Sequence, residues 1–458
     1  MQNGMQNGHE HWSSRFVFLM AAVGAAVGLG NLWKFPYTAG VSGGAAFVIV
    51  YIVAIIAVAV PIVAAELLIG RRGRMSPVNS FRNLAREAGA SSAWRFVGML
   101  NVLAVFLILS FYSVIAGWAL AYLPKLASGR LTGADADTVG EVFADLLASP
   151  APLTLWHAVF MGLTVFIVSR GLKGGIERAV RFLMPALLVM LLLLVGYAAV
   201  AGNFGAAIEF LFQADFSKIT PGVALGAVGQ AFFSVSVAMG LLITYGSYLD
   251  QDVSLTRSAV AIAGADTLVA LLAGLAIFPL VFANGLDPAE GPGLLFVTLP
   301  LAFGHMPGGA LFGSIFFMLL IVSALTSTIA VLEPIVAWAE EHKGWRRGPA
   351  AVVAGLLAWS TGLATVFSFN VWKDVHPLGH FETFAGKTVF DLIDYATSNI
   401  MLPLGGILIA VFTGWIMTRE ATRDELGIAD GWIFRAWRIA MRYIAPAAVG
   451  LVLLANLA

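Results

Sequence analysis

The sequence predicts an all-α integral membrane protein with eleven transmembrane helices. First, 59% of its 458 residues are hydrophobic and only 11% are charged, whereas a soluble chain carries about a quarter charged residues. Second, apolar runs of the ~20 residues that a spanning helix needs recur along the whole chain. Third, two of these runs are interrupted by small and polar residues, a pattern typical of discontinuous helices.

The composition also excludes several classes of protein. Lys plus Arg equals Asp plus Glu at 26 each, so the basic surplus of a nucleic-acid-binding protein is missing. We therefore expect a lipid bilayer around the chain and no nucleic-acid partner. The chain has no cysteine, which excludes disulfides and cysteine-ligated metals. Paired carboxylates, a metal-ligating histidine pattern and a nucleophile motif are also missing from the sequence, so we do not expect an enzyme.

The apolar runs define the elements in order. The eleven predicted spans are 14–38, 42–69, 95–124, 152–169, 174–200, 221–249, 257–285, 308–340, 350–369, 388–417 and 432–456. Residues 1–13 form a polar tail before the first span. Spans one to five occupy residues 14–200 and spans six to ten occupy residues 221–417, with 432–456 as an additional eleventh helix.

The loops predict the orientation. Most Lys and Arg residues fall in loops on the same side as the N-terminus, for example in the loop 70–95. Because basic loops stay in the cytoplasm, we expect a cytoplasmic N-terminus and, after eleven spans, a C-terminus outside. The expected location is the inner (plasma) membrane.

The first and sixth spans are poor continuous helices. The first contains Gly24, Gly28, Gly30 and Asn31 near mid-membrane, and the sixth contains two serines and a glycine within 234–240. Each glycine costs about 1 kcal/mol relative to alanine in a helix. Small-residue packing is the alternative explanation, since Gly24 and Gly28 also form a GxxxG spacing. The two spans are, however, five helices apart, which fits an inverted repeat whose broken helices meet at a midplane site.

Broken helices have a defined chemistry. Unwinding exposes backbone N–H groups, which suit a carboxylate, and carbonyl groups, which suit an alkali cation. Ionisable residues inside spans are further candidates because they are costly in lipid. These residues are Lys34, Glu66, Asp266, Glu333, Asp391 and Asp394. For each of them, a hydrogen-bonded role in helix packing is the alternative.

Several sequence motifs resemble those of a known protein family. Residues 28–37 read Gly-Leu-Gly-Asn-Leu-Trp-Lys-Phe-Pro-Tyr and are followed by Gly43-Gly44. Later come Glu66 ahead of Gly70-Arg71, the run 229–236 and the run 325–330. In this order and spacing they resemble the neurotransmitter:sodium symporter family, whose bacterial members transport amino acids. The resemblance covers nearly the whole chain and implies two inverted five-helix repeats with unwound spans one and six.

The resemblance also implies binding sites. The implied substrate site comprises Ala25, Ala26, Val27, Gly28, Gly30, Ile108, Tyr112, Phe233, Ser234, Ser236, Met239, Ser327 and Val331. Two sodium sites are implied, the first from Ala26, Asn31, Ser234 and Asp266, and the second from Gly24, Val27, Ser323, Thr326 and Ser327. Hard oxygen ligands of this kind suit an alkali cation.

Gates and ion dependence follow from the same resemblance. An outer ion pair would join Lys34 to Asp394, and an inner gate would use Trp12 and Glu341, with His9 where the family usually has arginine. Asp266 would replace the chloride ion that some members require. The resemblance thus implies a sodium-coupled symporter that imports an apolar or aromatic L-amino acid by alternating access, without chloride. An amino-acid-sensing receptor or a channel on the same scaffold is the alternative.

Overall fold

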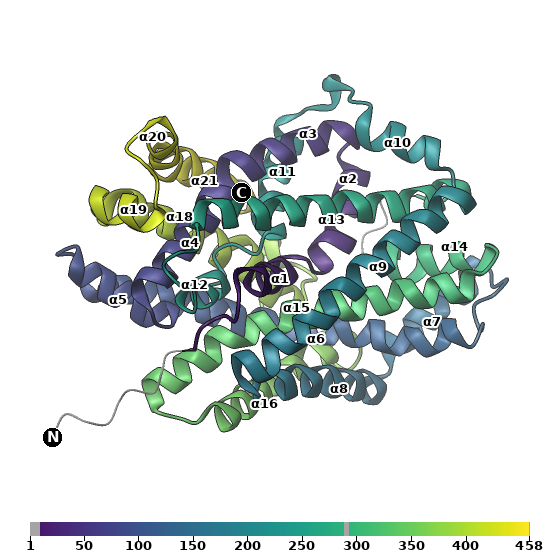
Figure 1. Cartoon of the computed structure of the whole chain (residues 1–458). Coiled ribbons are helices and arrows are strands. Elements are labelled where there is room, and N and C mark those ends of the chain that lie inside the picture. The colour runs from purple at the N-terminus through teal and green to yellow at the C-terminus, as the bar shows by residue number, and fades with distance from the viewer. Residues whose placement is uncertain (1–9, 288–292, 458) are drawn as a thin grey trace.

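The computed structural model describes residues 10–287 and 293–457, and every regular element in these ranges is helical (Figure 1). Up to the middle of the chain the helices are α1 (Arg15–Ala26), α2 (Phe35–Val41), α3 (Ala45–Ala54), α4 (Val60–Gly73), α5 (Pro77–Glu87), α6 (Arg95–Ala127), α7 (Ala136–Ala148), α8 (Pro150–Val168), α9 (Glu177–Ala201) and α10 (Phe204–Phe212). The second half contains α11 (Pro221–Ser234), α12 (Leu241–Ser247), α13 (Leu255–Ala283), α14 (Leu299–His305), α15 (Gly309–Lys343), α16 (Arg347–Ser368), α17 (Val389–Asp394), α18 (Leu402–Val411), α19 (Arg419–Leu426), α20 (Trp432–Ile439) and α21 (Ala445–Leu457).

π-helical segments adjoin several of these α-helices and extend them into longer helices. They are Gly30–Lys34 before α2, Ile55–Ala59 between α3 and α4, Leu172–Ile176 before α9, Leu294–Thr298 before α14, Tyr395–Met401 before α18, Phe412–Ile416 after it and Ala440–Ile444 between α20 and α21. Short 3₁₀ turns occupy Ser92–Trp94, Phe216–Lys218 and Glu382–Phe384.

Nine of the predicted spans are confirmed as helices long and apolar enough to cross a membrane within the described residues. Their bounds agree with the predictions to within about four residues, as expected for helix ends. The first predicted span is a bent pair, Arg15–Ala26 and Gly30–Val41, whose axes differ by 51°. The sixth consists of α11 with 14 residues and α12 with 7, separated by residues 235–240. Neither piece alone reaches the ~20 residues of a spanning helix.

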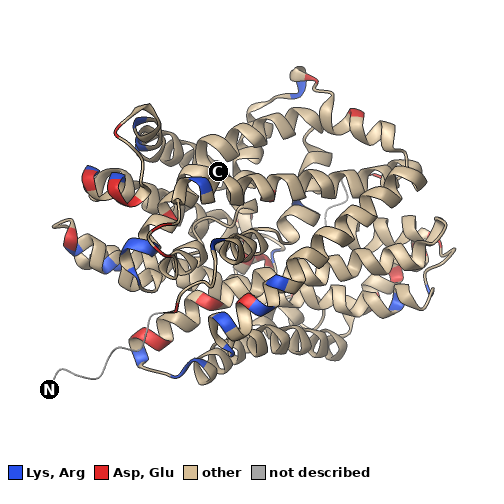
Figure 2. Cartoon of the chain, viewed as in Figure 1, with Lys and Arg blue, Asp and Glu red and all other residues tan. Residues whose placement is uncertain are grey.

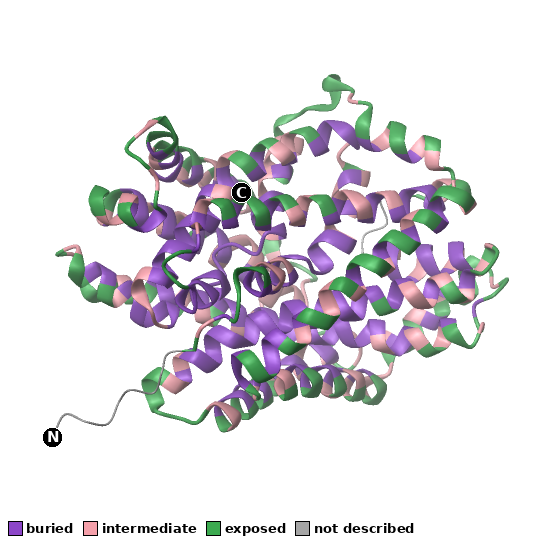
Figure 3. Ribbon diagram, viewed as in Figure 1, coloured by how far each residue is buried: buried purple, intermediate pink, exposed green. Residues whose placement is uncertain are grey.

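The two broken helices occupy the interior of the bundle. α1 packs against α9, α12, α13 and α15, whereas α12 packs against α4, and α11 against α3 and α21. Figure 3 shows buried residues concentrated around α1, α12 and α15, with exposed residues on the outward faces of the surrounding helices. Exposed apolar side chains such as Phe182 and Val200 are normal where lipid is the solvent. The breaks therefore lie among polar and apolar groups from several helices, away from lipid.

Candidate substrate and ion sites at the helix breaks

The break in the first helix exposes backbone groups. α1 ends at Ala26, and Val27 leaves the helical region with a ψ of 102°. The backbone N–H of Leu29 donates to the hydroxyl of Tyr112 at 3.0 Å. A Cβ on Gly28 would lie 2.7 Å from both this hydroxyl and that of Ser327. Only glycine therefore lets the unwound chain approach these two hydroxyl groups.

The break in the sixth helix is a strained turn. Ser236 and Ala238 have positive φ angles of 56° and 64°, a region that costs an L-residue other than glycine roughly 1–3 kcal/mol. Neighbouring groups hold the turn: the amide of Asn101 donates to the carbonyl of Ala238, and the hydroxyl of Ser236 donates to the carbonyl of Ala25 at 3.4 Å. The buried carboxylate of Glu66 faces the same turn. Contacts from three other helices thus keep the backbone unwound.

A cavity of about 40 Å³ lies between the two breaks. All predicted substrate residues except Val27 line it, and Val27 is fully buried behind it. The lining residues are Ala25, Ala26, Gly28, Gly30, Ile108, Leu109, Phe111, Tyr112, Phe233, Ser234, Ser236, Met239, Ser327, Thr328 and Val331. Leu109, Phe111 and Thr328 were not predicted, although their neighbours in sequence were. No ionisable carboxylate, ammonium or guanidinium group is among these lining residues.

Buried polar groups meet on one side of this cavity. Asn31 donates through its amide to Asp266 Oδ1 at 2.8 Å and to the hydroxyl of Ser234 at 3.1 Å. The hydroxyl of Ser234 donates to Asp266 Oδ2 at 2.6 Å, and that of Tyr51 is 3.5 Å from the same oxygen. Ala26 lies beside the cavity at the end of α1. Three of the four residues predicted for the first sodium site thus lie in contact around one carboxylate, and the fourth, Ala26, lines the same cavity.

A second set of oxygen atoms gathers between α1 and α15. The hydroxyl of Ser327 lies 3.5 Å from the carbonyl of Gly24, 3.3 Å from that of Val27 and 3.1 Å from that of Ser323. The hydroxyl of Thr326 lies 2.9 Å from the same carbonyl of Ser323. All five residues predicted for the second sodium site therefore place an oxygen atom here. Neutral, hard oxygen atoms at this spacing fit an alkali cation.

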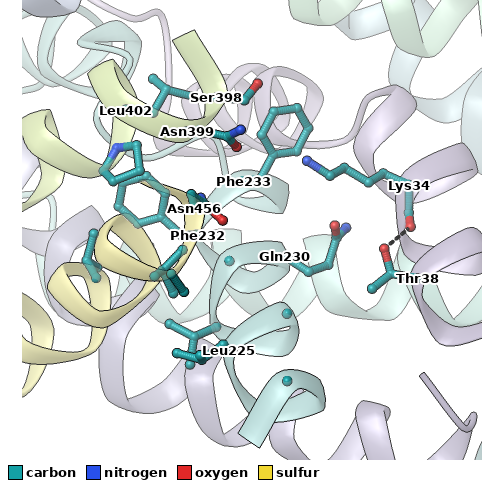
Figure 4. Close-up of a pocket in the computed structure, with 18 residues that line it drawn as sticks. Lys34, Thr38, Leu225, Gln230, Phe232, Phe233, Ser398, Asn399, Leu402 and Asn456 are labelled. Atoms are coloured by element: carbon teal, nitrogen blue, oxygen red, sulfur yellow. Dashed lines mark hydrogen bonds between the residues drawn. The ribbon is translucent and has the colours of Figure 1, made fainter. Parts of the chain in front are cut away.

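The outer side of the cavity is closed by Phe233, which also lines a larger cavity of about 420 Å³ (Figure 4). Figure 4 shows the side chain of Lys34 reaching toward the ring of Phe233. The ammonium nitrogen lies 3.9 Å from the ring centroid. Within the described residues the predicted Lys34–Asp394 ion pair is not in direct contact, and Asp394 accepts from the hydroxyl of Ser398 at 2.8 Å. The two charges attract each other only at longer range.

Trp12 and Glu341, the residues predicted for the inner gate, each bond a different partner. Trp12 is buried, and its indole N–H donates to the carbonyl of Tyr245 at 3.0 Å. Among the described residues, Glu341 bonds α5 and not Trp12. It accepts from the backbone and hydroxyl of Ser76, both at 2.6 Å, and from the amide of Asn79 at 2.7 Å, because the start of α5 packs beside the end of α15. His9 lies outside the described residues.

A buried ion pair near the inner end was not predicted as a pair. Glu333, fully buried in α15, accepts from the guanidinium of Arg347 at the start of α16 and from the hydroxyl of Tyr248 at 2.8 Å. Arg347 also bonds Glu340 at 3.3 Å and the carbonyl of Val168 at 2.9 Å. The available sequence signal was an acid inside one span followed by an arginine opening the next.

Two helix breaks around an enclosed cavity, with flanking clusters of oxygen ligands, define a secondary transporter. The family model described as the sodium:neurotransmitter symporter family matches residues 9–139 and 137–458. The chain therefore belongs to this family.

Similar proteins agree with this membership. A sodium-dependent transporter of Bacillus subtilis, YhdH, is 37% identical over 97% of this chain and 96% of its own length. A sodium-dependent transporter of Haemophilus influenzae is 34% identical over 97% of this chain and 98% of its own. Among solved structures, MhsT in complex with L-phenylalanine has a TM-score of 0.89 and 42% identity, covering 98% of this chain and 100% of that one.

Proposed function

We propose that this member of a sodium-dependent transporter family is a symporter that couples the entry of two sodium ions to the import of an apolar or aromatic L-amino acid. The observation that carries the proposal is the cavity between the two breaks. Its polar groups are the exposed backbone and the hydroxyls of Tyr112 and of several serine and threonine residues, while Ile108, Phe233, Met239 and Val331 supply an apolar wall. MhsT, whose structure contains L-phenylalanine, has the same fold.

Each part of an amino acid has a complementary surface in this proposal. The carboxylate meets the backbone N–H groups of residues 26–30 and the hydroxyl of Tyr112, since helix breaks favour anions at their N–H ends. The ammonium meets the carbonyl groups near Ala25, Phe233 and Ser234. The side chain meets the apolar wall, where Met239 can adapt its shape to several substrates.

In this proposal, sodium ions bound at the two oxygen clusters supply the free energy for uptake as they move down their electrochemical gradient. One ion binds at Ala26, Asn31, Ser234 and Asp266, and the other at Gly24, Val27, Ser323, Thr326 and Ser327. Two charges crossing a 100 mV potential release about 4.6 kcal/mol, which supports an accumulation of more than about a thousandfold. The carboxylate of Asp266 makes chloride unnecessary at the first site.

The proposal includes the topology of the chain. α11 and α12 together form the sixth of eleven spans, and residues 14–200 and 221–417 are the inverted repeats. Figure 2 shows charged residues gathered toward the end of the molecule that contains α5, α19 and α20. We assign this end and the N-terminus to the cytoplasm, and the C-terminus to the outside of the plasma membrane.

Alternating access requires gates at both ends. Lys34 and Phe233 close the outer end, with Asp394 acting at longer range, while Trp12 and the Arg347–Glu333 pair close the inner end. Glu341 fastens α5 to α15. These assignments follow from the contacts described above.

Uptake into proteoliposomes tests the function. A sodium gradient should drive accumulation of labelled Leu, Met, Phe or Trp, and these amino acids should compete with one another more strongly than Glu, Lys or γ-aminobutyrate. Saturable binding without sodium-driven accumulation would favour a receptor, and uptake that never exceeds equilibration would favour a channel.

Cysteine labelling tests the topology, because the chain contains no cysteine of its own. A membrane-impermeant maleimide should label a Ser128→Cys variant in intact spheroplasts and should label Arg86→Cys only after the membrane is opened. The reverse pattern would overturn the orientation.

A further inference from the structure

Three arginines form a surface that the transport mechanism does not use. Arg435, Arg438 and Arg442 follow one another at helical spacing through α20 and the π-helical segment Ala440–Ile444. Residues three and seven positions apart lie on one face of a helix. Arg419 of α19 is a further charged neighbour of Arg438. We call Arg435, Arg438 and Arg442 the arginine stripe.

Two members of the stripe are fixed by protein contacts that leave their charges unbalanced. Arg442 donates through Nε to the carbonyl of Gly414 at 2.7 Å, and Arg438 donates to the hydroxyl of Thr422 at 3.3 Å. In the part of the chain that the structure describes, neither guanidinium has an ion pair. Asp430 is paired with Arg419 at 2.7 Å and Asp424 with Arg423 at 2.9 Å, and Glu420 attracts Arg438 only beyond ion-pair distance.

Aromatic side chains flank the stripe and indicate its depth in the membrane. Trp415, Trp432 and Tyr443 are 50%, 77% and 56% exposed. The guanidinium of Arg442 lies over the ring of Trp415, 4.7 Å from its centroid, and the indole N–H of Trp415 donates to the carbonyl of Arg442 at 3.4 Å. Exposed Trp and Tyr concentrate at the headgroup level of a bilayer. The stripe therefore lies where lipid phosphates lie.

We infer that Arg438 and Arg442 bind the headgroup of an anionic phospholipid, with Trp415 beside its glycerol region. Each guanidinium offers a planar fork of donors, and arginine is the side chain best suited to hold a phosphate with two parallel hydrogen bonds. A lipid phosphate would give an ion pair to two guanidinium groups that have none among the described residues. Anionic lipids attract basic residues at the membrane surface in the same way.

The topological role of basic residues is the competing explanation, because loops facing the cytoplasm are rich in Lys and Arg in any membrane protein. The two explanations differ in specificity. A topological signal depends on the number of charges at this end of the molecule, whereas a binding site depends on Arg438 and Arg442. Arg86 and Arg95 are exposed arginines at the same end and provide a matched control.

Native mass spectrometry of the full chain in a neutral detergent tests the inference. We expect the wild type to retain one phosphatidylglycerol more tightly than phosphatidylcholine of equal chain length. The double variant Arg438→Gln/Arg442→Gln should bind phosphatidylglycerol about thirtyfold more weakly, since each arginine near an anionic surface contributes about fivefold. Arg86→Gln/Arg95→Gln should retain it like the wild type. Equal loss in both variants, or no lipid preference in the wild type, would overturn the inference.

Further measurements test whether the double variant is folded, whether the shape of the guanidinium matters beyond its charge, and whether the bound phosphate belongs to a lipid. Sodium-dependent amino-acid binding should be unchanged in Arg438→Gln/Arg442→Gln, which shows that the variant is folded. Should it not fold, Arg438→Lys/Arg442→Lys keeps both charges but loses the forks, and its affinity for phosphatidylglycerol should fall severalfold; wild-type affinity would contradict the proposed clamp. Soluble glycerol 3-phosphate should not displace the lipid, whereas ready displacement would indicate a site for free phosphate esters.

Discussion

We predict that the wild type transports without chloride and that replacing Asp266 by asparagine makes transport depend on chloride. The carboxylate of Asp266 is fully buried and accepts hydrogen bonds from Asn31 at 2.8 Å and from Ser234 at 2.6 Å, with the hydroxyl of Tyr51 at 3.5 Å. An asparagine side chain at this position would keep the shape of the aspartate and one acceptor oxygen. Its amide nitrogen donates, so the hydroxyl of Ser234 would have to turn and accept. The substitution would remove the negative charge that, in the proposed first sodium site, balances the ion.

The size of the effect follows from the same geometry. A chloride ion held by the hydroxyls of Tyr51 and Ser234 would lie about 5 Å from the carboxylate, where two like charges repel by about 3 kcal/mol at an effective dielectric constant of 20. This repulsion weakens chloride binding to the wild type by more than a factor of ~100, since each 1.4 kcal/mol is a factor of ten. In Asp266→Asn the repulsion is absent, and chloride can supply the missing charge.

The assay is sodium-driven uptake into proteoliposomes in chloride or in gluconate. The wild type should transport equally well in both anions. Asp266→Asn should be inactive in gluconate and partly active in chloride. Asp391→Asn is the matched control: Asp391 caps the start of α17 through Thr388, so its rate should not depend on the anion. A wild type that loses uptake in gluconate would refute the reasoning.

Three further predictions concern the second ion cluster and the gates. Thr326→Ala removes one hydroxyl from the cluster beside Ser323, so the sodium concentration for half-maximal uptake should rise while the melting temperature changes little; unchanged sodium dependence would argue against that site. Lys34→Met removes a cation–π contact of about 1 kcal/mol over Phe233, so labelled substrate should dissociate about fivefold faster, and a wild-type rate would exclude the contact as a gate. Arg347→Gln leaves Glu333 buried without its cation, which should lower stability by about 3–5 kcal/mol; adding Glu333→Gln should restore part of the melting temperature, and equal losses in both variants would contradict a charge effect.

Much of the fold could be predicted from the sequence because the signals are local. The length of an apolar run indicates a spanning helix, and nine such helices appear near the predicted positions within the described residues. Glycines at 24, 28 and 30 indicate where the first helix is weak, and the chain does leave the helix at Val27. Most residues of the central cavity could be predicted too, but from the resemblance of their motifs to those of a known family and not from local helix signals.

The partners of the charged groups were decided only by tertiary structure. Lys34 contacts Phe233, Glu341 binds the start of α5, and Glu333 is paired with Arg347. Each choice depends on distances of a few ångströms between helices far apart in sequence, which hydrophobic patterns do not encode. The residues determine which helices form and where they break, whereas the packing of those helices determines which charges meet.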